Sequence, residues 1–230
     1  MNLESLIGVG IYSVPEAARL SGVSAARIRR WMLGYSYSTG ERRRFSLPLW
    51  HHQLPPVEGS QALSFRDLIE VRFIDAFRDL GLGWKALRIA AEHAADLVRS
   101  SHPFSTKKFK TDGKTIFAEI AEESGERSLL DLVQRQYSFR EFVDPFLYKG
   151  LEFGEGESIL RWFPMLPSRR IVIDPAVGFG QPIVDPEGVP TQVFARSVAA
   201  EGSVERVANW FEVDPRAVRD AVEFQQRLAA

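Results

Sequence analysis

Hydrophobic residues recur at the three- and four-residue spacing of helices along much of the chain. Before residue 100 this pattern predicts four helices, over residues 12–20, 24–33, 64–80 and 84–98. Ser13 and Glu16 form a capping box at the start of the first helix, and Ser24 caps the second. Gly22 lies between these two helices, where a tight turn favours a positive φ. The first two helices are therefore expected to be joined by a very short turn.

Shorter runs of β-forming residues predict small β elements. Two strands on either side of Thr39-Gly40 make a hairpin over residues 35–45. Asp112-Gly113 predicts another hairpin, between residues 108–110 and 115–117. A β-type run follows at residues 171–173, and three further helices are expected to begin near Thr191, Ser203 and Asp214.

Composition indicates a globular chain whose charge is unevenly distributed. Its 230 residues suffice for two domains of ordinary size, and 45% hydrophobic residues exclude disorder along its whole length. The absence of cysteine excludes disulfides, thiolate nucleophiles and cysteine-bound metals. The net charge is −1, yet residues 19–44 contain seven arginines and one acidic residue, Glu41. Such a basic cluster suits nucleic acid, with a solvated basic surface as the alternative.

The basic cluster coincides with the two helices joined by a glycine-containing turn, which is the arrangement of a helix-turn-helix. The second helix of such a motif enters the major groove of DNA. The following hairpin carries three arginines beside two tyrosines and would contact the phosphate backbone. The candidate DNA-binding residues are Ser24, Arg27, Arg29, Arg30, Tyr35, Tyr37, Arg42, Arg43 and Arg44.

Residues 10–98 resemble the winged helix-turn-helix region of MerR-family regulators. The matching residues are Tyr12, Ser13, Val14, Ala17, Ala18, Gly22, Val23, Ser24, Arg30 and Trp31. This resemblance implies binding to double-stranded operator DNA. The sequence lacks the long dimerisation helix and the metal-binding cysteines of many members, so a metal-sensing role is not expected.

The last part of the chain resembles the small domain of VapB-like antitoxins that accompany PIN-type toxins. The matching residues are Ile171, Asp174-Pro175, Gly180-Gln181-Pro182, Gly188, Gly202-Ser203 and Ala221–Phe224. This resemblance implies a toxin partner whose ribonuclease site holds clustered acidic residues and Mg²⁺. The candidate partner-binding residues are Arg161, Trp162, Phe163, Arg169 and Arg170.

The two resemblances divide the chain into residues 1–100 for DNA binding, a middle segment 101–167 that includes the second hairpin, and an antitoxin domain at 168–230. The expected fold is mainly α-helical with small β-hairpins: an N-terminal winged helix-turn-helix and a small C-terminal domain resembling a helix-turn-helix. The expected protein is a cytoplasmic type II antitoxin that neutralises a PIN-type toxin and represses its own operon. It would be a homodimer or part of a larger toxin–antitoxin complex, with no contact to membranes.

An alternative function is a MerR-type one-component regulator that responds to a small molecule. Its effector pocket would use the aromatic residues of the middle segment, which are otherwise ordinary core: Phe104, Phe109, Phe117, Phe139, Phe142, Phe146, Phe153, Trp162 and Phe163. The sequence contains no Gly-x-Ser-x-Gly nucleophile motif, and no Lys-Ser/Thr follows Gly178-Phe179-Gly180. No enzyme activity and no cofactor are therefore predicted. His51-His52 has no acidic residue at helical spacing, so no metal site is predicted either.

Overall fold

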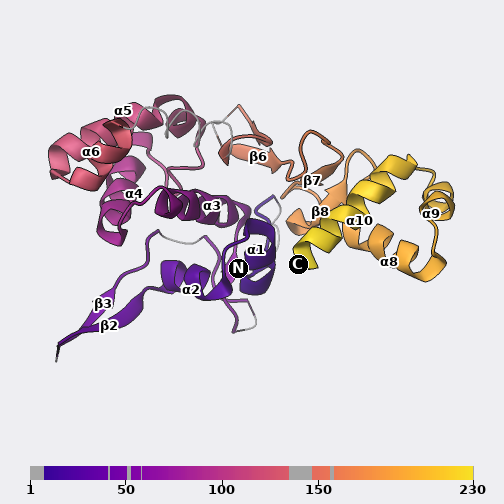
Figure 1. Cartoon of the computed structure of the whole chain (residues 1–230), viewed down its shortest axis with the longest axis horizontal. Helices are drawn as coiled ribbons and strands as arrows, with labels where there is room; N and C mark the ends of the chain where they lie inside the picture. Colours follow the sequence, from indigo (N-terminus) through magenta and orange to yellow (C-terminus); the bar gives the residue numbers. More distant parts are fainter. Residues whose placement is uncertain are drawn as a thin grey trace. The chain divides into compact units, whose positions relative to one another are not determined.

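The computed structural model describes residues 8–40, 42–50, 53–57, 59–134, 147–155 and 158–229. The chain folds into two compact units. The N-terminal unit consists of Tyr12–Lys149 and Glu155–Ile159, and the C-terminal unit of Met1–Ile11, Gly150–Gly154 and Leu160–Ala230. The described elements are mostly helices with small sheets, which confirms the predicted mainly helical class (Figure 1). His51 and His52 lie outside the described residues.

The N-terminal unit begins with the four helices and the hairpin predicted from the sequence, together with two short strands, Tyr12–Ser13 and Ala62–Leu63, that the sequence did not predict. They are β1 (Tyr12–Ser13), α1 (Val14–Ser21), α2 (Ala25–Leu33), β2 (Tyr35–Thr39), β3 (Arg42–Ser46), β4 (Ala62–Leu63), α3 (Phe65–Asp79) and α4 (Trp84–Val98). Strands β2 and β3 form an antiparallel hairpin, and β1 pairs with β4. The β1–β4 pair connects the start of α1 to the start of α3, although these helices are far apart in the sequence.

The predicted hairpin at Asp112-Gly113 is wrong, because this segment belongs to the helix α5 (Lys107–Ser124), which α6 (Arg127–Gln134) follows. The Phe109 ring packs closely on Gly113: a Cβ atom at that position would lie 3.1 Å from it. Burial of Phe109 thus favours the helix over the turn preference of Asp-Gly.

Four phenylalanines form the aromatic core of the N-terminal unit. The rings of Phe77, Phe104, Phe109 and Phe117 meet edge-on with centroids 5.1–6.3 Å apart, and each is at most 1% exposed. Three of the middle-segment aromatics are therefore core. Phe139, Phe142 and Phe146 lie outside the described residues, and Phe153, Trp162 and Phe163 belong to the C-terminal unit.

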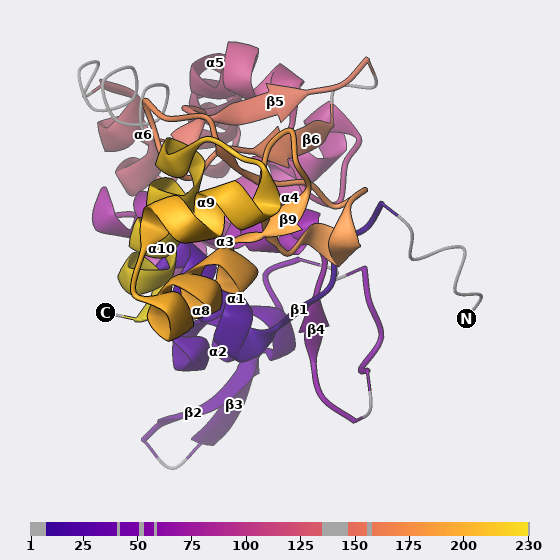
Figure 2. The same cartoon turned by 90° about the vertical axis from the view of Figure 1, so that its right-hand side faces the viewer.

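The C-terminal unit combines a small sheet with three helices (Figure 2). The sheet has the strand order β5 (Leu151–Phe153), β6 (Ile159–Trp162), β7 (Ile171–Ile173), β8 (Pro182–Val184) and β9 (Val189–Pro190), and η3 (Gly178–Gly180) connects β7 to β8. The helices are α8 (Thr191–Glu201), α9 (Val204–Phe211) and α10 (Pro215–Ala229). Phe194, fully buried on α8, meets Phe211 edge-on at 5.0 Å and ties α8 to α9. All three helices lie where the sequence predicts them.

Crossing a bilayer requires a long apolar helix, and none of the helices in the described ranges is of that kind.

Candidate functional site

A turn of three residues joins α1 to α2, as predicted. Ser13 starts α1 with a capping box, in which its N–H donates to the Glu16 carboxylate at 2.8 Å and its hydroxyl accepts the Glu16 N–H. Gly22 ends α1 with φ 76°, a conformation that glycine adopts at little cost. Ser24 is exposed, and its hydroxyl accepts the Arg27 N–H at 3.4 Å. Ser24 therefore fixes the start of α2.

Helix α2 separates a buried face from an exposed basic face. Ile28, Trp31 and Met32 are at most 5% exposed and pack inward. The other face carries the three exposed arginines Arg27, Arg29 and Arg30. The predicted division of this helix into core and surface is thus confirmed.

Two of these arginines already have partners within the N-terminal unit. Arg27 Nη1 donates to Asp75 Oδ1 on α3 at 2.8 Å. The Arg30 guanidinium lies 5.2 Å from the centroid of the Tyr35 ring. Arg29 forms no ion pair with any residue that the structure describes. Arg29 is therefore the α2 arginine most available to a phosphate, whereas Arg27 would have to leave Asp75.

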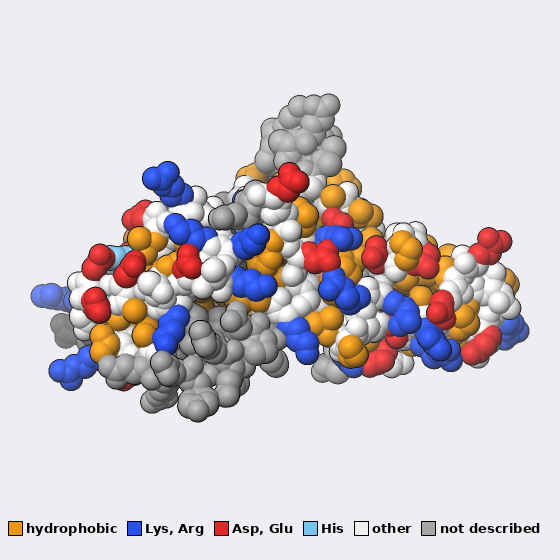
Figure 3. Space-filling view, turned by 90° about the horizontal axis from the view of Figure 1, so that it is seen from above, with side chains coloured by type: hydrophobic (Ala, Val, Ile, Leu, Met, Phe, Trp, Pro, Cys, Tyr) orange, Lys and Arg blue, Asp and Glu red, His pale blue; other side chains and the backbone are white. Residues whose placement is uncertain are grey.

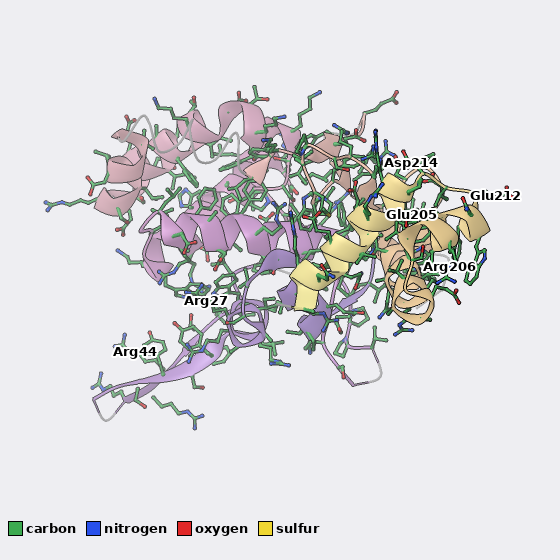
Figure 4. The ribbon with its side chains drawn as sticks, turned by 45° about the vertical axis from the view of Figure 1, so that its right-hand side comes forward. Arg27, Arg44, Glu205, Arg206, Glu212 and Asp214 are labelled. Carbon is green, nitrogen blue, oxygen red and sulfur yellow. The ribbon has the colours of Figure 1, made fainter. Side chains whose placement is uncertain are left out.

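The hairpin presents its three arginines on two faces. Arg44 lies opposite Tyr37, Arg43 opposite Ser38, and Arg42 opposite Thr39. Opposite residues in a strand pair point to the same face, and successive residues alternate. Arg42 and Arg44 consequently share a face with Tyr37, while Arg43 points to the other. All three arginines are exposed, and the hairpin extends away from the helices of its own unit (Figures 1 and 4).

The base of the hairpin is fastened to α4 by two residues that sequence reasoning missed. Trp84 Nε1 donates to Ser46 Oγ at 3.0 Å. The Arg88 guanidinium donates to the same oxygen at 3.1 Å, to the Leu47 carbonyl at 2.6 Å and to the Pro48 carbonyl at 3.1 Å. No local sequence signal predicts these contacts, because about 40 residues separate the donors on α4 from the acceptors at the base of the hairpin.

A buried polar cluster centres on Asp67 of α3, which is fully buried. Its carboxylate accepts hydrogen bonds from Trp50 Nε1 at 2.7 Å, from the Ser64 N–H and hydroxyl at 2.8 Å each, and from His102 Nε2 at 2.8 Å. Burial alone would raise the pKa of Asp67, but the hydrogen bonds and the charge of His102 lower it below its ordinary value. The cluster holds the loop after α4 and the segment after β3 against α3.

Glu70, one turn further along α3, is also buried. Its carboxylate accepts the backbone N–H groups of Phe104 and Ser105, each at 3.1 Å. Burial outweighs these contacts and raises the pKa of Glu70 to about 7. Glu70 also lines a cavity of about 270 Å³ between α3, α4 and the segment that follows β3.

Replacing Glu70 by glutamine is expected to change how stability depends on pH. The pKa of Glu70 is about 7 in the folded state and 4.5 ordinarily, so the folded protein binds the proton more tightly than the unfolded chain does. The resulting stabilisation is fully present below pH 4.5 and is lost as the pH rises through 7. The free energy of unfolding of the wild type should fall by about 3 kcal/mol across this window relative to Glu70→Gln. Urea titrations between pH 4 and 8 measure this difference. Parallel profiles for the two proteins would contradict it.

In the C-terminal unit, the structure brings together two of the predicted partner-binding arginines. Arg161 and Arg169 both bind the carboxylate of Glu152, Arg161 at 2.7 Å, and both guanidinium groups lie near the Phe163 ring. Their side chains are 36% and 53% exposed. Trp162 and Phe163 are at most 5% exposed, so their side chains belong to the interior of this unit. The accessible part of the predicted set is therefore cationic.

Arg170, the last of this set, contacts α10 instead. Its Nη1 donates to Asp220 Oδ2 at 3.1 Å, and Ser168 Oγ donates to the same oxygen. Arg170 is 36% exposed and thus remains partly accessible. Its main contact, however, fastens the start of β7 to α10.

An exposed aromatic side chain lies on a strained turn of the C-terminal unit. Phe179 has φ 57° between Gly178 and Gly180, which also have positive φ, and it is 55% exposed. The left-handed conformation costs a residue other than glycine about 1–2 kcal/mol. The sequence patterns of this stretch, a poor phosphate loop at Gly178-Phe179-Gly180 and a VapB-like motif that begins at Gly180, did not predict an exposed ring.

Helices α9 and α10 carry charges of both signs. Glu205 of α9 pairs with Arg219 of α10 at 3.7 Å, and Asp214 Oδ1 accepts the Arg216 N–H at 2.8 Å. The face drawn in Figure 3 likewise shows positive and negative side chains interspersed with hydrophobic ones. The described charged residues of α9 and α10 are thus of mixed sign, whereas the exposed charged residues of α2 and β3 are all arginines.

A sequence comparison and a structure comparison both find similarity over nearly the whole length of this chain, although no family model matches it. "Putative antitoxin VapB45" of Mycobacterium tuberculosis is 31% identical over 237 residues, which cover 96% of each protein. The chain belongs to the family of VapB45. A crystal structure of Rv2018 from the same organism superimposes with a TM-score of 0.73 and 27% identity, over 94% of this chain and 99% of that one. The similarity to the VapB45 family therefore includes both units.

Proposed function

We propose that this chain is the antitoxin of a type II toxin–antitoxin system, which neutralises a PIN-type ribonuclease toxin and represses its own operon. The observation that carries the proposal is the similarity to VapB45 over 96% of both proteins. A local likeness would leave one unit unexplained, whereas this similarity covers the units that bear the basic hairpin and the paired arginines. The cognate toxin and the operator DNA are the expected partners.

The DNA-binding half of the proposal assigns a MerR-like winged helix-turn-helix to α1, α2 and the β2–β3 hairpin. Its support is the capped turn, the exposed basic face of α2 and the hairpin arginines. Arg29 and the hairpin arginines would contact phosphates, and α2 would face the major groove. Residues 1–100 are the proposed DNA-binding region in this scheme.

The toxin-binding half rests on the cationic pair Arg161 and Arg169. A PIN-type active site is expected to be acidic, and guanidinium groups bind carboxylates in a bidentate way. Glu152 keeps both arginines together before binding. Residues 168–230 are the proposed VapB-like domain, residues 101–167 remain the middle segment, and the complex would be a homodimer or a larger hetero-oligomer.

Co-expression with the product of the neighbouring gene tests the toxin half. A neighbouring PIN-like protein with several spaced acidic residues should arrest growth when produced alone, and this chain should restore growth and co-purify with it. The Arg161→Ala and Arg169→Ala double variant should weaken the complex at least about tenfold, because arginines at interface centres contribute strongly to affinity. Calorimetric titration of the purified proteins measures the change.

The matched control is the double variant Arg206→Ala and Arg216→Ala, which removes two exposed arginines from the same unit. It should bind the toxin as the wild type does. An equal loss of toxin affinity in both double variants would show a nonspecific charge effect. Growth arrest that persists when the wild-type chain is co-expressed would refute the antitoxin assignment.

A further inference from the structure

Ser101, in the loop after α4, is an exposed residue next to the buried polar cluster of Asp67. Its hydroxyl oxygen lies 2.9 Å from His102 Nδ1, and His102 Nε2 lies 2.8 Å from Asp67 Oδ1. His102 and Asp67 are at most 1% exposed. The three side chains therefore form a continuous series of hydrogen bonds that leads from an accessible hydroxyl to a buried carboxylate.

The buried carboxylate decides which nitrogen of the imidazole can accept a proton. Asp67 is held in its ionised form, since its pKa lies below the ordinary value despite its burial. It accepts the Nε2–H of His102, so the neutral ring carries its lone pair at Nδ1. Ser101 donates its hydroxyl proton to that lone pair. The hydrogen bonds from Trp50 and Ser64 keep the carboxylate in position.

This arrangement is the one that activates a serine: the nucleophile is bonded to a base, and the base is bonded to a group that orients it. Such triads are defined by geometry and not by the order of their residues in the sequence. Here Ser101 and His102 are adjacent, and Asp67 comes from α3. The sequence around Ser101 therefore contains no nucleophile motif that would have indicated the triad.

Space for a reactant lies beside the serine. Ser101 lines the cavity of about 270 Å³, which is larger than the apolar cavity of about 150 Å³ that accommodates benzene. All of the lining residues belong to the N-terminal unit. Leu47, Pro48 and Ala95 are apolar lining residues that are not fully buried. They favour a short hydrocarbon chain whose reactive end meets Ser101.

We propose that Ser101 is an acylation site, to which an activated ester of a short-chain carboxylic acid transfers its acyl group. Ser101 Oγ attacks the carbonyl carbon and forms the new ester bond, and the bond from that carbon to the leaving oxygen breaks. The leaving group departs as an oxyanion with the bonding electrons, and the serine proton moves to His102 Nδ1. The Asp67 carboxylate stabilises the imidazolium that results. The site uses none of the residues assigned to DNA or toxin binding, so it does not depend on the proposed function.

Reaction of the full chain with p-nitrophenyl butyrate tests the nucleophile. Release of p-nitrophenolate measures the rate, and mass spectrometry of peptides locates the butyryl group. Ser38, an exposed serine on the hairpin, is the internal reference. Ser101 should be acylated at least about 100-fold faster than Ser38, because a positioned base typically accelerates such a step by about 10²–10⁴. Equal rates at the two serines would overturn the proposal.

Variants and unfolding test the role of the base. Ser101→Ala should abolish the fast release of p-nitrophenolate, whereas Ser38→Ala should leave it unchanged. His102→Gln keeps the nucleophile but removes the base, so acylation of Ser101 should fall about 100-fold. Because His102 is buried, the wild type in denaturing urea provides a second measurement, in which Ser101 should react only as fast as Ser38. Fast acylation of Ser101 in the unfolded chain, or in folded His102→Gln, would overturn the triad.

A comparison of butyryl with acetyl esters tests the part played by the cavity. The rate at Ser101 relative to Ser38 should be severalfold higher with p-nitrophenyl butyrate than with p-nitrophenyl acetate, because the longer chain buries more apolar surface in the cavity. The reference serine cancels the difference in intrinsic reactivity between the two esters. An equal ratio for both esters would refute the short-chain preference.

Discussion

Replacing Arg42, Arg43 and Arg44 together by alanine should lower the affinity for operator DNA about 100-fold. The three side chains are exposed on the hairpin, and the described residues offer them no ion pair that would compete with phosphates. Each phosphate contact that is lost should reduce the slope of log K against log salt by about 0.9, so the triple variant should bind with a slope smaller by about 3. Fluorescence anisotropy over a range of salt concentrations measures both quantities.

The charge-matched control replaces Lys107, Lys108 and Lys110, three exposed lysines at the start of α5 in the same unit. It should retain wild-type affinity and slope. The hairpin register also divides the three arginines into two groups that can be replaced separately. Arg42 and Arg44 share one face, and Arg43 lies on the other. If the control and the hairpin variant lose affinity equally, the hairpin is not the DNA contact.

Replacing Asp67 by asparagine should lower the free energy of unfolding by about 3–5 kcal/mol. One carboxylate accepts four hydrogen bonds in this cluster, from Trp50, Ser64 and His102. An amide group would place N–H donors against some of these donors, and an unpaired buried polar group is costly. Since domains are stable by only about 5–15 kcal/mol, this loss is a large part of the total. Urea unfolding measured by circular dichroism gives the value.

Asp96→Asn is the matched control, because Asp96 is an exposed acid on α4. It should change stability by no more than about 0.5 kcal/mol. An unfolding midpoint for Asp67→Asn equal to that of this control would show that the cluster contributes little to stability.

Local signals in the sequence predicted most helices of the described chain. Ser13 with Glu16, Ser24 and Asp214 are helix starts that depend only on neighbouring residues, and each begins a helix in the structure. Asp112-Gly113 is a local signal too, but the burial of Phe109 overrides it. Contacts between distant residues decide such cases, and the spacing of residues along a sequence does not reveal them.

The sequence predicted which residues of the candidate site are exposed and basic, but not the acidic residues with which they form ion pairs. The run of arginines indicated a basic surface, and α2 and the hairpin do expose them. The pairing of Arg27 with Asp75 joins residues 48 positions apart, and Glu152 binds both Arg161 and Arg169. These acidic partners lie on other elements, so sequence spacing offered no reason to choose them.

The fastening of the hairpin base to α4 has a consequence for the entropy of DNA recognition. Trp84 and Arg88 fix the strand end at Ser46, and Gly34 at the other end approaches so closely that a Cβ atom there would lie 2.2 Å from the Ser46 carbonyl oxygen. The backbone beneath the arginines is thus ordered during folding rather than on encounter with a duplex. Binding then loses conformational freedom mainly in the arginine side chains, so more of the electrostatic attraction is retained as affinity.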